Sequence, residues 1–560
     1  MERNKIMKTK YLIISVMSAL VLVSCKDYLD AEYKGGTQSN SQVQATVGAI
    51  PTRINAAVSG MYSKLGKPYT YFGTGASSRD DDLGYTTITL SLDLNSGDMV
   101  NPVSDYDWFS VALEFSDRTP NYANPRARSG LLYNVIYSAN EVISSVDSTT
   151  TDAELLQKVG QAKAMRAFCY LNMVPYFQFK YVGHEQSPTV PIMADEKTDL
   201  DPLNNPRAPM NVMYDYIISD LNDAIELLDG FTRGNKGIID QKVAYGLRAR
   251  AYLNMEKWAE AAADAAKAVE GYTPYDPQEI SAPGFYNADD HNWMWALLIP
   301  ASTAGEEAAT WPSQLGSFSA AGYTAYAGIY RQINSLLYAK ISQTDVRKGW
   351  WLNEEKQSPL LEGLSWTDVA KKITYKGQEI ADAVIADTKV AMPAYSNVKF
   401  GQKAGVGSTY NEGDWCLMRA EEMLLIQAEA TAKAGDLAAG KTILENFVRG
   451  YRDPQYTCNA SSVEAFSDEV WLQRRIELWG EGFAMADKMR LEKNIVRYHP
   501  GDQSTNVPPR YQFNIAANDP WLLMRFTQTE LNGNALVEQN EGGTEPKQGD
   551  GAGLKDGVTD

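Results

Sequence analysis

The sequence has few of the residues on which metal, redox and nucleophilic sites depend. Its 560 residues include only 4 cysteines and 3 histidines, and neither type occurs at the spacing of a zinc or dithiol site. Beyond Cys25 the remaining cysteines are odd in number, which excludes a complete disulfide framework. We therefore expect no metal and no cofactor.

Positive charge and long apolar runs are also scarce. Lysine and arginine total 52 against 70 acidic residues, a formal net charge of −18, and no basic stripe interrupts this acidity. Such a chain has little attraction for phosphate backbones, so we expect no nucleic-acid partner. Beyond the first 25 residues no apolar run approaches the 18 residues that a membrane-spanning helix needs.

The N-terminal segment has the pattern of an export signal. Basic residues precede an apolar run, Tyr11–Val23, which at 13 residues is too short to cross a bilayer and ends at Ser24-Cys25. This pattern resembles the bacterial lipobox, in which the cysteine is acylated; an ordinary secretory signal beside a chance cysteine is the alternative. We expect residues 1–24 to be a signal peptide, Cys25 to carry the lipid, and residues 25–47 to form a tether.

Helical periodicity is strongest in two parts of the chain. The stretch Gln241–Glu270 has the residue spacing of a tetratricopeptide helix hairpin, at Tyr252, Trp258, Ala261 and Ala268. The stretch Leu424–Val448 has a similar hairpin pattern. Unrelated amphipathic helices would give similar periodicity. We predict a mainly α fold, a tetratricopeptide-like scaffold over residues 130–270 and 415–495.

Two stretches, residues 69–107 and 275–410, lack this periodicity. The second holds half of the 12 tryptophans together with many prolines and glycines. We expect both to be loop-rich insertions into one domain of residues 48–540, and residues 541–560, which are rich in glycine, to be a disordered tail.

An ordered set of motifs resembles the SusD/RagB family of outer-membrane nutrient-binding lipoproteins. After CKDYLD at residues 25–30, the motifs are LYNVIYSANEVI at 132–143, GQAKAMRAFCYL at 160–171, DYIISDLNDAI at 215–225, LMRAEEMLLIQAEA at 417–430 and RRIELWGEGFAMADKMR at 474–490. The resemblance implies a non-catalytic lipoprotein on the cell surface. It would bind an oligosaccharide and deliver it to a SusC-like TonB-dependent transporter in the outer membrane. A peptide- or protein-binding member of the same family is one alternative, and a lipid-anchored glycoside hydrolase is another.

Two acidic groups could carry other chemistry. Glu477 and Glu481 lie one helical turn apart, but Arg474 and Arg475 precede them, so we interpret them as structural ion pairs. The run Asp80-Asp81-Asp82 could bind calcium or a sugar, or be a solvated loop, since it lacks the ligand spacing of a known calcium loop.

The aromatic loops are the best candidate for ligand binding. A pyranose ring presents an apolar face edged by hydroxyl groups, which aromatic rings and a few polar side chains accept together. We predict stacking by Trp311, Tyr323 and Tyr326, with polar contacts from Arg79 and Asp81. This requires the fold to bring the two insertions together on one face.

Overall fold

The computed structural model describes most of the chain after residue 39. The described residues are 40–68, 79–104, 107–193, 201, 203–299, 310–320, 327–362, 364, 367–368, 371–372, 392–408, 410–502 and 504–560. Cys25 and the predicted signal peptide therefore lie outside them.

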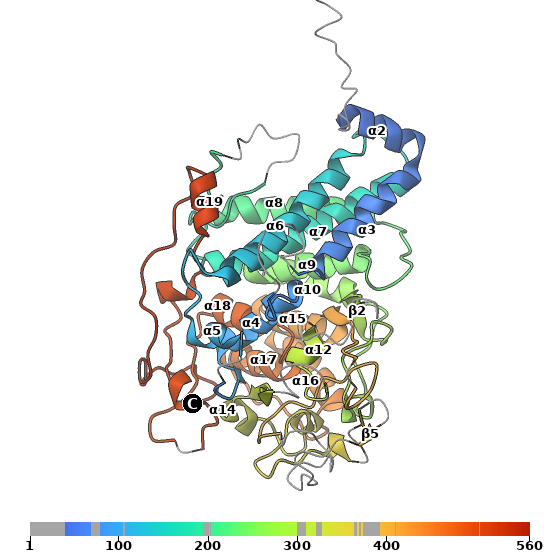
Figure 1. Cartoon of the computed structure of the whole chain (residues 1–560). Helices are drawn as coiled ribbons and strands as arrows, with labels where there is room; N and C mark the ends of the chain where they lie inside the picture. Colours follow the sequence, from blue (N-terminus) through green and yellow to red (C-terminus); the bar gives the residue numbers. More distant parts are fainter. Residues whose placement is uncertain are drawn as a thin grey trace, which may run out of the picture.

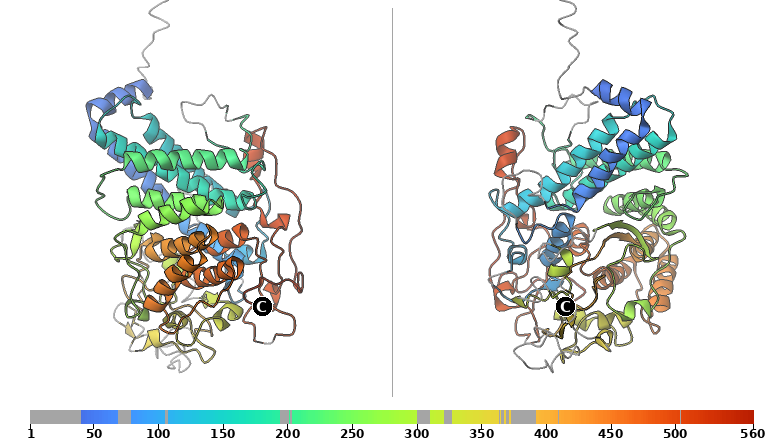
Figure 2. Two further views of the ribbon diagram at one scale, coloured as in Figure 1. Left: turned by 180° about the vertical axis from the view of Figure 1, so that it is seen from behind. Right: turned by 45° about the vertical axis from the view of Figure 1, so that its right-hand side comes forward.

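Helices stacked in successive layers form the scaffold (Figures 1 and 2). In stacking order they are α3 (Ile54–Leu65), α6 (Ala123–Ser144), α7 (Ala153–Phe177), α8 (Met210–Leu227), α9 (Gln241–Asn254), α10 (Trp258–Val269), α15 (Ala420–Lys433), α16 (Leu437–Tyr451) and α17 (Val463–Glu477). Among the described residues, no helix combines the length and apolarity that a membrane crossing requires.

The predicted hairpins are confirmed. On α10 the small residues Ala261, Ala265 and Ala268 are fully buried, which lets neighbouring helices approach closely. In the α15–α16 hairpin, Gly435 takes the turn at φ +114°. A Cβ at Gly440 would lie 2.8 Å from the Ala428 carbonyl oxygen, so only glycine allows this contact.

Shorter elements surround the scaffold. The helices are α2 (Asn40–Ala49), α4 (Tyr85–Ser96), α5 (Ser110–Glu114), α12 (Trp311–Gln314), α14 (Ser335–Ala339), α18 (Ala484–Arg490), α19 (Gln528–Gly533) and the 3₁₀ turns η1 (Pro51–Arg53), η3 (Glu279–Ser281), η4 (Val346–Trp350), η5 (Pro359–Leu361), η6 (Pro509–Tyr511) and η7 (Pro520–Leu522). The described strands form antiparallel pairs: β1 (Met99–Val100) with β3 (Gln332–Ile333), β2 (Trp293–Leu297) with β6 (Trp415–Arg419), and β4 (Thr367–Asp368) with β5 (Lys371–Lys372). The protein is thus mainly α, as predicted.

The expectation that residues 69–107 are irregular is wrong for α4. Every residue of this helix is buried, including its threonines, serines and Asp93. The hydroxyl groups of Thr86, Thr89 and Ser96 donate to main-chain carbonyls three residues earlier, which satisfies them without water. A helix buried on all sides needs no amphipathic stripe, so periodicity could not reveal it.

Both predicted flexible ends also need correction. The tether was expected to reach residue 47, but α2 begins at Asn40. The expected disordered tail packs on the domain instead: Asp556 is 4% exposed and pairs with Arg475 at 3.0 Å. Its main chain contributes as well, since the Asp550 carbonyl accepts from Asn514 N–H at 2.9 Å. Polar pairing holds this segment, and composition alone does not reveal such pairing.

A buried ion network connects the loop-rich region to the last helices. Glu477, at the end of α17, is fully buried and accepts from Arg347 at 3.1 Å, Arg419 at 2.8 Å and Arg452 at 2.8 Å. Burial alone would raise its pKa, but the charges of Arg452 and Arg419 hold the pKa well below its ordinary range. Structural ion pairing is confirmed for Glu477, with different arginines from those predicted. Arg474 pairs with Asp487 instead.

Asp93 is a second buried carboxyl group, and main-chain N–H groups donate to it. It accepts from Gly482 N–H at 2.9 Å and Ala484 N–H at 3.4 Å, and so joins α4 to the turn after α17. Burial, reinforced by the charges of Asp98 and Glu481, raises its pKa from 3.8 to about 8. The folded protein therefore keeps a proton here that the unfolded chain releases.

This residue should make stability depend on pH. Because the pKa of Asp93 is raised from 3.8 to about 8, its contribution falls as pH rises from 6 to 8, by up to about 1.4 kcal/mol per pH unit. Asp93→Asn keeps a carbonyl acceptor but cannot ionise, so its urea-unfolding free energy should change less over this range. Equal pH slopes for the two proteins would contradict the assignment.

Candidate functional site

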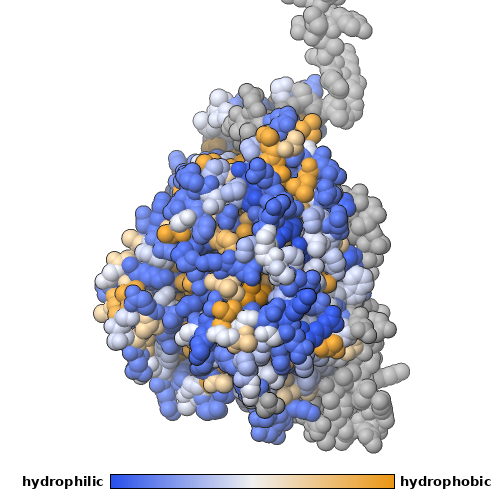
Figure 3. Space-filling view, turned by 90° about the vertical axis from the view of Figure 1, so that its left-hand side faces the viewer, coloured by the Kyte–Doolittle hydropathy of each residue, from blue (hydrophilic) through white to orange (hydrophobic). Residues whose placement is uncertain are grey.

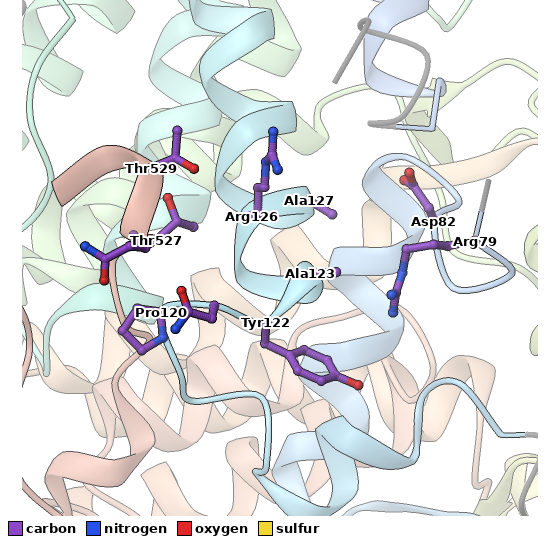
Figure 4. Close-up of a pocket in the computed structure, with 11 residues that line it drawn as sticks. Arg79, Asp82, Pro120, Tyr122, Ala123, Arg126, Ala127, Thr527 and Thr529 are labelled. Carbon is purple, nitrogen blue, oxygen red and sulfur yellow. The ribbon is translucent and has the colours of Figure 1, made fainter. Parts of the chain in front are cut away.

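Three segments far apart in sequence enclose a pocket of about 280 Å³ (Figure 4). One is the turn before α4, with Arg79 and Asp82; the second is the start of α6, with Tyr122 and Arg126. The third is the start of α19, residues 527–529, which is tied to the second by the bond from Gln528 N–H to the Pro120 carbonyl at 3.0 Å. Loops and helix ends on a rigid scaffold are a common setting for binding sites.

Arg79 is held in place by its neighbours. Its guanidinium donates to both carboxylate oxygens of Asp81, at 2.8 and 2.9 Å, and to Asn124 Oδ1 at 3.0 Å. Burial opposes its charge, but the bonds to Asp81 prevail and raise the pKa of Arg79. The structure thus brings the predicted Arg79 and Asp81 together. The Asp81 side chain is 1% exposed, which makes it a support for Arg79.

An exposed aromatic ring lies beside Arg79. The Arg79 guanidinium is 5.0 Å from the centre of the Trp108 ring, and Trp108 is 41% exposed. Tyr122 extends toward Arg79 from the start of α6 (Figure 4), and burial raises the pKa of its hydroxyl group. Together, Trp108, Tyr122 and Arg79 combine aromatic surface with polar donors. The sequence reasoning missed Trp108, although a tryptophan within a polar run without helical periodicity was a usable signal.

Trp311 lies in a different environment. It is 2% exposed, donates from Nε1 to the Gly413 carbonyl at 2.8 Å, and packs against Trp415 with ring centres 5.3 Å apart. The Trp311 ring therefore packs in the core of the loop-rich region. Tyr323 and Tyr326 lie outside the described residues, so their stacking role stays a prediction.

The acidic groups have structural partners. Glu481 accepts from Lys399 at 2.7 Å and from Arg419 at 2.8 Å, and these charges lower its pKa despite burial. No group of histidine, cysteine, aspartate and glutamate in the described part of the chain could hold a metal ion. In the run Asp80–Asp82, Asp81 is engaged by Arg79.

Comparisons with known proteins agree with this architecture. A model of the SusD family matches residues 362–542, and a second, described as "Starch-binding associating with outer membrane", matches residues 99–253. The chain belongs to the SusD/RagB family. It is thus a member of a family of binding proteins associated with the outer membrane. No curated protein matches significantly.

Several solved structures share the fold of this SusD/RagB protein. A SusD-like carbohydrate binding protein from Bacteroides vulgatus superimposes with a TM-score of 0.70 at 22% identity, over 88% of this chain and 98% of that one. A putative sugar binding protein from the same species gives 0.67 at 21%, over 88% and 99%. A SusD superfamily protein from Bacteroides fragilis gives 0.63 at 20%, over 87% and 99%.

The contrasting exposure of Trp311, at 2%, and Trp108, at 41%, predicts unequal losses of stability when each ring is removed. Trp311→Ala should lower the free energy of unfolding by about 3–5 kcal/mol, because it empties a packed aromatic cluster. Trp108→Ala should lower it by about 1 kcal/mol or less, because that ring is partly solvated. Chemical denaturation of both variants beside the parent protein measures this difference, and equal losses would contradict the placement of Trp311.

Proposed function

We propose that this protein is a non-catalytic, lipid-anchored lipoprotein of the cell surface that captures an oligosaccharide and delivers it to a TonB-dependent transporter. The observation that carries the proposal is the exposed Trp108 ring beside the fixed guanidinium of Arg79, a residue that lines the pocket. An aromatic ring accepts the C–H face of a sugar, and a fixed arginine donates to its hydroxyl rim. The predicted Tyr323 and Tyr326 remain part of this proposed surface.

The ion pairing of Glu477 and Glu481 supports a binding role without catalysis. Glycosidases need two carboxyl groups facing each other across a cleft. Glu477 and Glu481 are instead buried and saturated by arginine and lysine, which leaves no free oxygen for acid or base chemistry at these positions. The surface that carries the C-terminal segment is predominantly hydrophilic, with small separate apolar patches (Figure 3).

The function predicts binding without cleavage. The purified domain should bind at least one glycan on an array, and the glycan should be unchanged after long incubation, as checked by mass spectrometry. Trp108→Ala should weaken this binding roughly five- to tenfold, since a stacked ring contributes on the order of 1 kcal/mol. Tyr137→Ala is the matched control, because Tyr137 is 54% exposed on α6 and does not line the pocket. Shortened glycans, or binding of peptides alone, would contradict the proposal.

The anchor and the transporter can be tested together. We expect the protein to fractionate with outer membranes and to co-purify with a TonB-dependent transporter in mild detergent, because stacked helices offer a broad rigid docking surface. Cys25→Ser should abolish membrane fractionation, since acyl chains contribute about 0.8 kcal/mol per buried CH₂. An unacylated mature N-terminus in the membrane fraction, or a protein recovered without transporter, would contradict this part.

A further inference from the structure

Among the residues that the structure describes, Arg126 lines the pocket without an ion-pair partner. In the part of the chain that the structure describes, no carboxylate or hydrogen-bond acceptor engages its guanidinium, although it is half-buried and lines the pocket. Two other arginines nearby have carboxylate partners: Arg79, which also lines the pocket, pairs with Asp81, and Arg128, two residues further along α6, pairs with Asp117 at 2.9 Å. Partial burial of a guanidinium costs free energy, and an anion that pairs with the guanidinium offsets this cost.

Several hydrogen-bond donors lie near Arg126. It projects from the first turn of α6, between the loop of Asp82 and the threonines at the start of α19 (Figure 4). The 22-residue helix α6 begins without a side-chain cap, so the Ala123 and Asn124 N–H groups add partial positive charge at this end. Thr529 adds a hydroxyl group from α19.

The acidic residue of the lining does not cancel this preference. Asp82 is 3% exposed, so its carboxylate is enclosed by the protein, whereas Arg126 is accessible from the pocket. The chain as a whole carries a formal net charge of −18, which disfavours anions in general. An anion would therefore be attracted here by a local arrangement and not by the general field of the protein.

We propose that this pocket receives an anionic substituent of the bound oligosaccharide, a carboxylate or a sulfate ester, and that Arg126 pairs with it. The inference rests on the proposed function and narrows its ligand to acidic sugars. The volume of about 280 Å³ is at the lower end of ligand pockets, which suits one sugar unit with its substituent. The planar fork of arginine matches both anions, and the adjoining Trp108 and Arg79 would hold the next part of the glycan.

Matched pairs of sugars test this inference. The probes are tetragalacturonate and a hyaluronan tetrasaccharide, each beside its carboxyl-reduced form, and a chondroitin sulfate tetrasaccharide beside its desulfated form. At least one acidic member should bind about tenfold tighter than its neutral partner, with an advantage that shrinks at high salt. The uronate pairs and the sulfate pair show which anion is recognised. If every neutral partner binds as tightly as its acidic counterpart, or only neutral sugars bind, the inference is overturned.

Variants separate this charge effect from other causes. Arg126→Gln should remove the preference for the acidic member while leaving affinity for the neutral partner within about twofold, and Arg126→Lys should retain part of the preference. Arg53→Gln is the control, since it removes the same charge from an exposed residue of η1 outside the pocket lining. An unchanged preference in Arg126→Gln overturns the inference but not the proposed function. If the parent protein binds no carbohydrate at all, both this inference and the proposed function are overturned.

Discussion

The fold depends on a buried carboxylate, that of Glu477, which joins segments that are distant from one another in the sequence. Glu477 accepts from Arg347 in η4, from Arg419 at the end of β6 and from Arg452 after α16. Removing one member of such a cluster leaves uncompensated buried charge, which typically costs about 3–5 kcal/mol. The requirement to keep every charge paired therefore fixes how the loop-rich region sits on the last helices.

The candidate site inherits its rigidity from the same region. Glu481 follows in the turn after α17, where Gly482 N–H binds Asp93 and so holds α4. The turn before α4 carries Arg79, and Asp81 orients its guanidinium against Trp108. A ligand that meets this surface meets side chains that are already ordered, which lowers the entropic cost of binding.

Charge pairing also distinguishes support from function. Arg347, Arg419 and Arg452 are each engaged by carboxylates and hold the structure, while Asp81 orients Arg79. Arg126 is half-buried at a pocket without such a partner among the described residues, and this difference makes it the residue that we assign to the ligand. Only the tertiary structure distinguishes Arg126, because in the sequence it is one arginine among several in a polar run.

The sequence by itself determined the helical scaffold, because the spacing of the apolar residues indicates which face of each helix is buried. Examples are Tyr252, Trp258, Ala261 and Ala268. Its ordered motifs also identified the SusD/RagB family. Only the tertiary structure decided that α4 is a helix, that residues 541–560 are packed, and that Trp108 is exposed while Trp311 is enclosed. These features depend on contacts between distant segments, and local periodicity carries no information about such contacts.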